Sequence, residues 1–198
     1  MRNTWVTPYS VAFVCYYYFM KRFFILINRP QCAGSGRFEK MFLEKHPETF
    51  FVSKDKIKWL ISDYKKEKYS DTGTLNRMLL ALTKQIVKEG LSIILETTFD
   101  LNKNEHKDFK ELAEKNKMRF VILNLEAPVG LSLTRFRNKM AKIKESSTIT
   151  KVSNRSEKRF FEIFNSYDNQ KKFGDLTLDL TKIDELTAIS KVEKLINS

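Results

Sequence analysis

Short apolar runs and longer amphipathic stretches alternate along the chain from Phe23 to its end. The runs are rich in Ile, Leu, Val and Phe and have the length of buried strands, which predicts five strands. They cover residues 23–28, 49–52, 91–95, 119–125 and 176–180. Strands that alternate with helices argue for a parallel sheet with crossover helices, so the sequence predicts a three-layer α/β fold around a five-stranded sheet.

The stretches between these runs carry apolar residues at helical spacing. They predict helices over residues 38–45, 54–64, 75–87, 103–117, 130–142 and 184–196, and one more that restarts at Phe160. Ser53 is placed to cap the second of these helices and Gly90 to end the third. Residues 142–158 hold few apolar side chains and many Ser, Thr and Lys, which predicts a mobile segment.

The first strand leads directly into a loop of small and polar residues. The loop and its flanks read Arg29, Pro30, Gln31, Cys32, Ala33, Gly34, Ser35, Gly36 and Arg37. A turn of this kind between a buried strand and a helix directs backbone N–H groups at a phosphate, and the helix N-terminus adds positive potential. The pattern G-x-x-x-x-G-K-[ST] also requires a lysine and a hydroxyl, which this loop lacks. The sequence therefore predicts a phosphate-binding loop with altered key residues.

Polar side chains also follow the other predicted strands. Asp55 comes after the second strand, Glu96 to Thr98 after the third, and a basic segment after the fourth. In an open parallel sheet, ligands bind outside the carboxyl ends of the strands. We therefore expect these residues to converge on one site together with the loop.

The composition limits the fold class and the partners. With 198 residues, 42% of them hydrophobic and 30% charged, the chain has the length and apolar content of one globular domain. Its net charge of +12 and its pI of about 9.6 permit binding to a polyanion such as nucleic acid or a nucleotide. Lysine-rich helices that face solvent explain the same charge equally well, so the charge alone assigns no partner.

Residues 1–19 differ from the rest of the chain. They are apolar and aromatic, and after Arg2 they carry no charge. Scattered polar residues make them a poor membrane span, and they lack a signal-peptide cleavage pattern. They predict an appended segment, or a misassigned upstream start, before a domain of residues 20–198. Cys15 and Cys32 suit neither a disulfide framework nor a zinc site, which favours a reducing, cytoplasmic setting, and we expect a monomer without a membrane partner.

Five motifs in order resemble the P-loop kinases of the zeta-toxin and polynucleotide-kinase type, an AAA-domain, ATP-binding family. The motifs are ILINRPQCAGSGR from Ile25, FVSKDKIK from Phe51, GLSIILETT from Gly90, LEAP from Leu125 and DLTLD from Asp175. The family often has ILINGPQCAGKST at the first, D-x-[IL]-R at the second and D-x-T at the end of the third. Each motif alone is weak, but five in this order over residues 20–197 are fairly specific for the fold.

The loop departs from the family pattern in every alignment. Without a gap, Arg29 replaces the first glycine, Ser35 the lysine and Gly36 the Ser/Thr. Shifted by two residues, the loop keeps a cation at Arg37, but Phe38 then replaces the hydroxyl that binds magnesium. We prefer the ungapped alignment because it keeps the distance from strand to loop, although one missing residue would leave Ser35 as the hydroxyl. Arginine is a planar fork rather than a point charge, so it is no simple substitute for lysine.

The resemblance implies roles for residues that follow the second and third strands. Asp55 matches the general base of the family, which takes a proton from the acceptor hydroxyl as the phosphoryl group arrives. Lys58, one turn further on, would hold an anionic substrate. Glu96 would act through water on magnesium or contact substrate, and Thr98 would contact substrate. Each has an ordinary alternative, since acids in the first helical turn, loop acids and solvated lysines are common.

The resemblance also implies a lid and two cofactors. Arg135 and Arg137 lie on the helix before a lid at about residues 141–158, where they would neutralise charge on the transferring phosphoryl group. Ion pairs with surface acids are the alternative for both arginines. ATP and Mg²⁺ are the cofactors that the family implies, and the altered loop should weaken both.

Transfer of the ATP γ-phosphate to a hydroxyl is the activity that the resemblance implies. The acceptor would be a nucleic-acid end, a nucleotide sugar or another small molecule. The altered loop keeps open an inactive nucleotide- or nucleic-acid-binding regulatory protein on the same fold. A nucleic-acid-binding module rests on net charge alone, since residues 138–159 show no pattern of stacking aromatics among their basic residues. His46 and His106 lie among polar and charged residues, and we expect both to be exposed.

Overall fold

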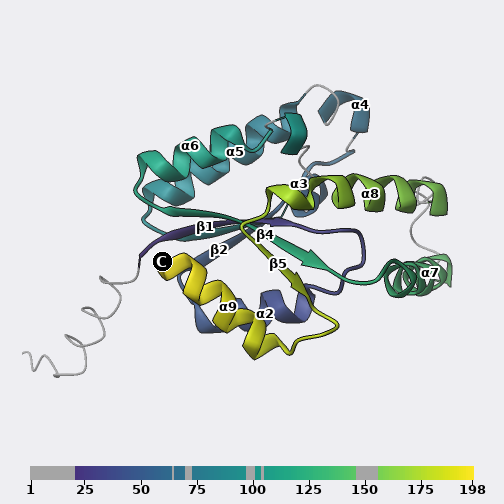
Figure 1. The fold of residues 1–198 in the computed structure, drawn as a ribbon. Coiled ribbons are helices and arrows are strands. Elements are labelled where there is room, and N and C mark those ends of the chain that lie inside the picture. Colours follow the sequence, from purple (N-terminus) through teal and green to yellow (C-terminus); the bar gives the residue numbers. More distant parts are fainter. Residues whose placement is uncertain (1–20, 64, 70–72, 97–100, 104, 146–155) are drawn as a thin grey trace, which may run out of the picture.

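The computed structural model describes residues 21–63, 65–69, 73–96, 101–103, 105–145 and 156–198. Its centre is a five-stranded sheet in which the paired strands run parallel. The strand order is β2-β3-β1-β4-β5, so β1, which leads into the loop, lies in the middle of the sheet (Figure 1). The predicted three-layer α/β fold is confirmed.

The five strands occupy the predicted runs to within one residue at each end. Their bounds are β1 Phe23–Asn28, β2 Thr49–Ser53, β3 Ser92–Glu96, β4 Arg119–Glu126 and β5 Leu176–Asp179. All of β1 is buried, as expected for a strand that helices cover on both faces. In the parallel register Glu96 pairs with Ile27 of β1 and with Ser53 of β2. The carboxyl ends of β1, β2 and β3 therefore meet at one edge of the sheet.

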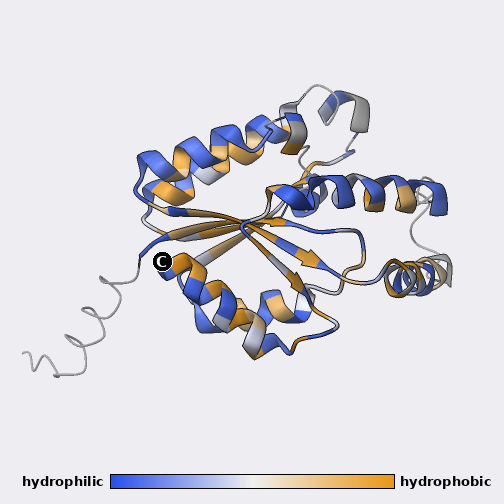
Figure 2. Cartoon of the chain, viewed as in Figure 1, coloured by the Kyte–Doolittle hydropathy of each residue, from blue (hydrophilic) through white to orange (hydrophobic). Residues whose placement is uncertain are grey.

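Helices cover both faces of the sheet (Figure 1). Their bounds are α2 Gly36–Lys45, α3 Lys54–Leu60, α4 Lys66–Tyr69, α5 Thr74–Lys88, α6 Lys107–Lys115, α7 Val129–Glu145, α8 Glu157–Gln170 and α9 Glu185–Asn197. α5 and α6 pack on one face, whereas α2 and α9 pack on the other. Figure 2 shows that these helices turn apolar residues toward the sheet and hydrophilic residues toward solvent.

Alternation of side chains along β1 supplies two separate hydrophobic cores. Phe24 and Leu26 belong to the core under α5 and α6, whereas Phe23, Ile25 and Ile27 belong to the core under α2 and α9. Each large apolar side chain that is fully buried stabilises the fold by about 1.5–3 kcal/mol. The strand before the loop is thus held from both sides, which fixes where the loop begins.

Two helices are shorter than the sequence predicts. The helix expected over residues 54–64 ends at Leu60, because Ile61 leaves it in an extended conformation and packs against the core. Ser53 lies at the N-cap of this helix, but its side chain forms no capping hydrogen bond. The helix expected over residues 103–117 begins only at Lys107, after a 3₁₀ turn at Leu101–Lys103. The residues in between are polar and have no apolar side chain to pack on the sheet.

The segment predicted to be mobile over residues 142–158 is helical at both ends. α7 continues to Glu145, in keeping with the helix propensity of its Lys, Ala and Glu residues. α8 begins at Glu157, where the Ser156 side chain accepts a hydrogen bond from the backbone N–H of Arg159. Residues 146–155, like the N-terminal segment, lie outside the described part of the chain. Within the described part, no helix is long and apolar enough to cross a membrane.

Candidate functional site

Residues 29–35 connect β1 to α2, as the sequence predicts, and the helix begins at Gly36, two residues earlier than expected. Two residues of this loop have a left-handed backbone, Cys32 with φ 62° and Gly34 with φ 91°. A positive φ is uncommon for any residue other than glycine, and such positions concentrate at binding sites. The loop backbone thus has a defined, non-standard shape at the N-terminus of a ten-residue helix.

Arg29, the first residue of the loop, is tied to the end of a neighbouring strand. Its Nη2 forms a short ion pair with Oε1 of Glu96, the last residue of β3. Its Nε lies 3.9 Å from Oε1 of Glu39, in the first turn of α2. Nε of Arg29 and Oε1 of Glu39 are both buried and have no hydrogen-bond partner among the described residues. One guanidinium therefore faces two carboxylates, and part of its hydrogen-bonding capacity is unused.

The surroundings of Glu96 disfavour its charge. Burial raises the pKa of Glu96 above its ordinary value, the guanidinium of Arg29 offsets part of that shift, and the carboxylates of Glu39 and Asp55 add to it. A carboxyl group whose pKa stays raised beside an arginine, at the carboxyl end of a strand, is a candidate functional group.

Arg135 of α7 contacts the loop from a distant part of the sequence. Its Nη1 donates a hydrogen bond of 2.8 Å to the carbonyl oxygen of Ala33. A Cβ atom at Gly34 would lie only 2.5 Å from this Nη1, so the guanidinium rests directly against the glycine. The lysine position holds Ser35, which is buried, but a cation from α7 lies against the loop.

Asp55 lies at the same sheet edge, as the sequence predicts. It is the second residue of α3, which follows β2 directly, and the last residue of β2, Ser53, pairs with Glu96. One carboxylate oxygen, Oδ1, accepts a hydrogen bond of 2.6 Å from Nζ of Lys58. The Asp55 side chain is 75% exposed, so an acceptor molecule can reach it from solvent.

Two positions bear on the alignment of the loop with a phosphate-loop pattern. Phe38, which would take the place of the metal-binding hydroxyl in the shifted alignment, is buried in the core and lies 5.8 Å from Phe42 between ring centroids. Gly34 has the positive φ expected of the last loop glycine, whereas Gly36 begins the helix with open space around it. Both facts favour the ungapped alignment.

The loop offers no hydroxyl ligand to a magnesium ion at the metal-binding position. In the ungapped alignment the position of the metal-binding hydroxyl is Gly36, which has no side chain. Magnesium requires oxygen ligands in near-octahedral geometry. Across the described ranges, no group of three or more His, Cys, Asp or Glu side chains could hold a metal ion. We therefore assign no chemical step to a metal.

Two predicted site residues are not placed at the loop. Arg137 binds both carboxylate oxygens of Glu157, through Nε at 2.7 Å and Nη2 at 3.0 Å, on the exposed surfaces of α7 and α8. Of the two roles considered for Arg137, the structure contains the ion pair with a surface acid. Thr98 and most of the predicted lid lie outside the described residues.

The prediction that both histidines are exposed is wrong: His106 is half-buried in the lining of a groove, and His46 is buried. This side chain is only 6% exposed, stacks on Phe42 with 4.3 Å between ring centroids, and has its Nε2 3.0 Å from Oε1 of Glu193. Burial lowers the pKa of His46, and the charge of Glu193 offsets part of that shift. His46, the C-cap of α2, follows Phe42 by four residues and therefore lies on the same, buried side as Phe42. The prediction considered only its charged neighbours in sequence.

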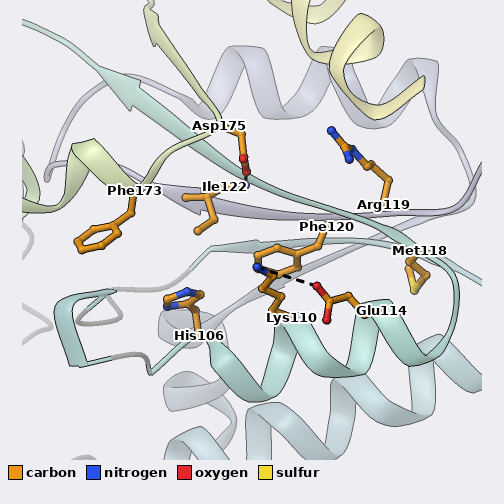
Figure 3. A pocket seen from close by; sticks show the side chains of 9 residues that line it. All are labelled: His106, Lys110, Glu114, Met118, Arg119, Phe120, Ile122, Phe173 and Asp175. Carbon is orange, nitrogen blue, oxygen red and sulfur yellow. Dashed lines mark hydrogen bonds and ion pairs between the residues drawn. The ribbon is translucent and has the colours of Figure 1, made fainter. Parts of the chain in front are cut away.

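A separate groove, with a volume of about 490 Å³, lies beside the first half of β4 (Figure 3). Its lining includes Phe120, Ile122, Phe173, His106, Lys110 and Glu114. Asp175 closes one end, where its carboxylate accepts a hydrogen bond of 2.7 Å from the backbone N–H of Ile122. The groove is at the amino-end side of the sheet, away from the loop, so we give it no part in the phosphate site.

Glu39 is a site residue that the sequence did not reveal. It lies in the first turn of α2, where acidic residues are common because the helix dipole favours them. Only the folded structure shows that its carboxylate is buried beside Arg29.

The sequence matches no protein-family model and no curated protein. The structure does resemble solved structures. A provisionally described kinase of Chloroflexus aurantiacus is 16% identical, with a TM-score of 0.61, and the match covers 89% of this chain and 96% of that one. APS kinase of Mycobacterium tuberculosis, solved with AMPPNP and APS, is 12% identical, with a TM-score of 0.57 and coverage of 90% and 99%. Shikimate kinase of Acinetobacter baumannii, solved with shikimate, is 14% identical, with a TM-score of 0.54 and coverage of 91% and 96%.

At these identities the similarity establishes the fold. The chain has the fold of the P-loop kinases, with a five-stranded parallel sheet flanked by helices. The comparisons do not single out the zeta-toxin and polynucleotide-kinase group that the sequence motifs resemble.

Proposed function

We propose that this protein is an ATP-binding phosphotransferase that moves the γ-phosphate to a hydroxyl, with an efficiency reduced by its altered loop. The observation that carries the proposal is the convergence of the 29–35 loop, Asp55 and Arg135 at one edge of the sheet. These parts lie far apart in the sequence, and they meet where open α/β sheets bind their ligands.

The proposed chemistry follows from the position of each group. Backbone N–H groups of the loop and the N-terminus of α2 would hold the phosphates of ATP. Asp55 would take the proton of the acceptor hydroxyl while its oxygen bonds to the γ-phosphorus. The bond from that phosphorus to the bridging oxygen breaks at the same time, and ADP leaves. Arg135 would neutralise charge on the transferring group.

The proposed acceptor carries a hydroxyl group. A hydroxyl on a nucleic-acid end, a nucleotide sugar or a small molecule fits the exposed Asp55. Lys58, hydrogen-bonded to Asp55, would orient that carboxylate and attract an anionic acceptor. Glu96, the last residue of β3, and Thr98, two residues further on, would face the acceptor side, and residues 141–158 would close over the phosphates. The net charge of +12 permits an anionic acceptor.

A second function, nucleotide binding without phosphoryl transfer, is favoured by one observation. The lysine that contacts the β- and γ-phosphates in phosphate loops is absent, and the one arginine inside the loop is paired with Glu96. A protein that binds nucleotide as a signal does not need the transition-state contacts that a kinase requires.

Phosphoryl transfer from γ-labelled ATP to a panel of acceptors separates the two functions. The panel would contain oligonucleotides with free 5′-hydroxyls, nucleotide sugars and small polyols. We expect Asp55→Asn to lower transfer by about 10²- to 10⁴-fold while ATP binding is kept. Asp108→Asn, which removes another exposed acid from the first turn of a helix, is the control and should change neither. ATP binding without transfer to any acceptor would support the regulatory function instead.

A further inference from the structure

We infer that Arg29 is the phosphate-binding cation of this site, and that Glu96 is a carboxylate latch which the terminal phosphate of a bound nucleotide displaces. The inference rests on the proposed nucleotide site. In phosphate loops a lysine near the end of the loop supplies the positive charge. Here we assign that charge to Arg29, at the start of the loop.

The position of Arg29 suits this role. It directly follows the last residue of β1, in the middle of the sheet, and its guanidinium lies at the carboxyl ends of β1 and β3. The side chain is 25% exposed, so it is sheltered but still reachable from solvent. A guanidinium so placed lies beside the loop whose backbone would hold the phosphates.

The present contacts of Arg29 are incomplete. Its Nε is buried without a hydrogen-bond partner, although Oε1 of Glu39 lies 3.9 Å away and is itself buried and unpartnered. A buried donor without a partner costs about 1–3 kcal/mol. A phosphate offers several acceptor oxygens to the planar fork of an arginine, and such bidentate contacts are among the strongest in proteins. A phosphate could therefore accept hydrogen bonds from the donors of Arg29 that Glu39 and Glu96 leave without a partner.

The charge around Arg29 explains why Glu96 must yield. Glu39 and Glu96 place two carboxylates beside the one guanidinium of Arg29, and Asp55, with Lys58 as its counter-ion, adds a third negative charge that acts on Glu96. A phosphate that approached while Glu96 held Arg29 would meet net negative charge. Exchange of Glu96 for the phosphate keeps the cation paired and leaves the Glu96 carboxylate buried without its counter-ion.

Displacement of Glu96 has a pH signature. Glu96 faces Arg29, Glu39 and Asp55, and of these only Arg29 lowers its pKa. Loss of that cation, and the arrival of a phosphate, would raise the pKa of Glu96 further. Because the pKa is then higher in the bound state than in the free state, ATP binding takes up a proton. The affinity should fall as the pH rises through the interval between those two pKa values.

The test is ATP binding to the full chain by titration calorimetry, in two buffers of different ionisation enthalpy. Arg29→Ala should weaken ATP binding by about 10-fold or more, and Glu96→Gln should tighten it and abolish proton uptake. In the double variant the gain from Glu96→Gln should vanish, because the cation it would free is absent. AMP, which lacks the terminal phosphates, should respond less to either change. Arg159→Ala and Glu162→Gln break an exposed arginine–glutamate pair on α8 and serve as controls.

The outcomes separate this inference from the function on which it rests. If the wild type binds ATP but Arg29→Ala binds it equally well, or Glu96→Gln binds it more weakly, the latch is wrong and the nucleotide site stands. If Arg29→Ala does not fold, Arg29→Lys and Glu96→Gln still decide the question. Failure of the wild type and of Glu96→Gln alike to bind ATP would overturn the nucleotide site and the latch together.

Discussion

The guanidinium of Arg135 lies against Gly34, at the point that any side chain at position 34 would have to occupy. The glycine also has φ 91°, a backbone conformation that disfavours other residues. Because Gly34 has no side chain, Arg135 of α7 can lie directly against the loop. This relationship joins two parts of the site that are about a hundred residues apart in sequence.

Gly34→Ala should therefore damage the site more than the fold. The new Cβ would lie 2.5 Å from Nη1 of Arg135 and force the arginine away, and the left-handed backbone would add about 1–2 kcal/mol of strain. We expect ATP affinity to fall, with a modest loss in the free energy of unfolding measured in urea. Gly130→Ala, in α7 with open space around it, is the matched control and should leave ATP affinity unchanged. An unaltered ATP affinity in Gly34→Ala would show that the backbone shape of the loop at Gly34 does not matter for ATP binding.

Arg135→Ala should affect phosphoryl transfer more than nucleotide binding. A charge that stabilises the transferring group is needed most in the transition state, so its loss lowers kcat. We expect a fall of about 10²- to 10³-fold in kcat, with a much smaller change in the Kd for ATP. The measurement is steady-state transfer beside calorimetry on the same protein. Equal losses in both quantities would mean that Arg135 only anchors the loop through Ala33.

His46 should make the stability of the fold depend on pH. Burial lowers its pKa below the ordinary value of 6.5, so the folded state resists protonation more than the unfolded state does. Stability is therefore full above about pH 6.5 and is lost as the pH falls toward the lower pKa of the folded state, by at most about 1.4 kcal/mol per pH unit. His46→Phe keeps an aromatic ring on Phe42 but cannot titrate, so its thermal unfolding midpoint should fall less between about pH 7.5 and pH 5.5. Parallel falls in both proteins would assign the acid sensitivity to other groups.

The fold was predictable because its signals are local and repeated. The run from Phe23 to Asn28 is apolar throughout, and a strand of that kind has to lie inside a covered parallel sheet. Helix ends were less predictable, since the end of α3 at Leu60 depends on the packing of Ile61 against residues elsewhere in the chain. Tertiary contacts decided these boundaries, and propensity alone does not contain them.

The candidate site was predictable in outline and not in its contacts. The loop, Asp55 and Glu96 were expected at one sheet edge, because the carboxyl ends of parallel strands meet there. The pairing of Arg29 with Glu96, and the burial of Glu39 beside them, depend on side-chain positions that no spacing rule gives. Arg135 and Arg137 were equivalent in sequence, two residues apart on one helix. Only the structure shows one against the loop and the other paired with Glu157.

The most direct test is the affinity for ATP of the wild type and of a variant with its phosphate loop restored. In the ungapped alignment the restoring changes that leave Arg29 in place are Ser35→Lys and Gly36→Ser. Since one charge-assisted contact contributes about 1.5–3 kcal/mol, calorimetry should show weak binding by the wild type and roughly 10- to 150-fold tighter binding by the variant. Arg159→Ala, which removes an exposed side chain of α8 that pairs with Glu162, should bind ATP as the wild type does. No binding by either the wild type or the restored variant would contradict the assignment of residues 29–36 as a phosphate-binding loop.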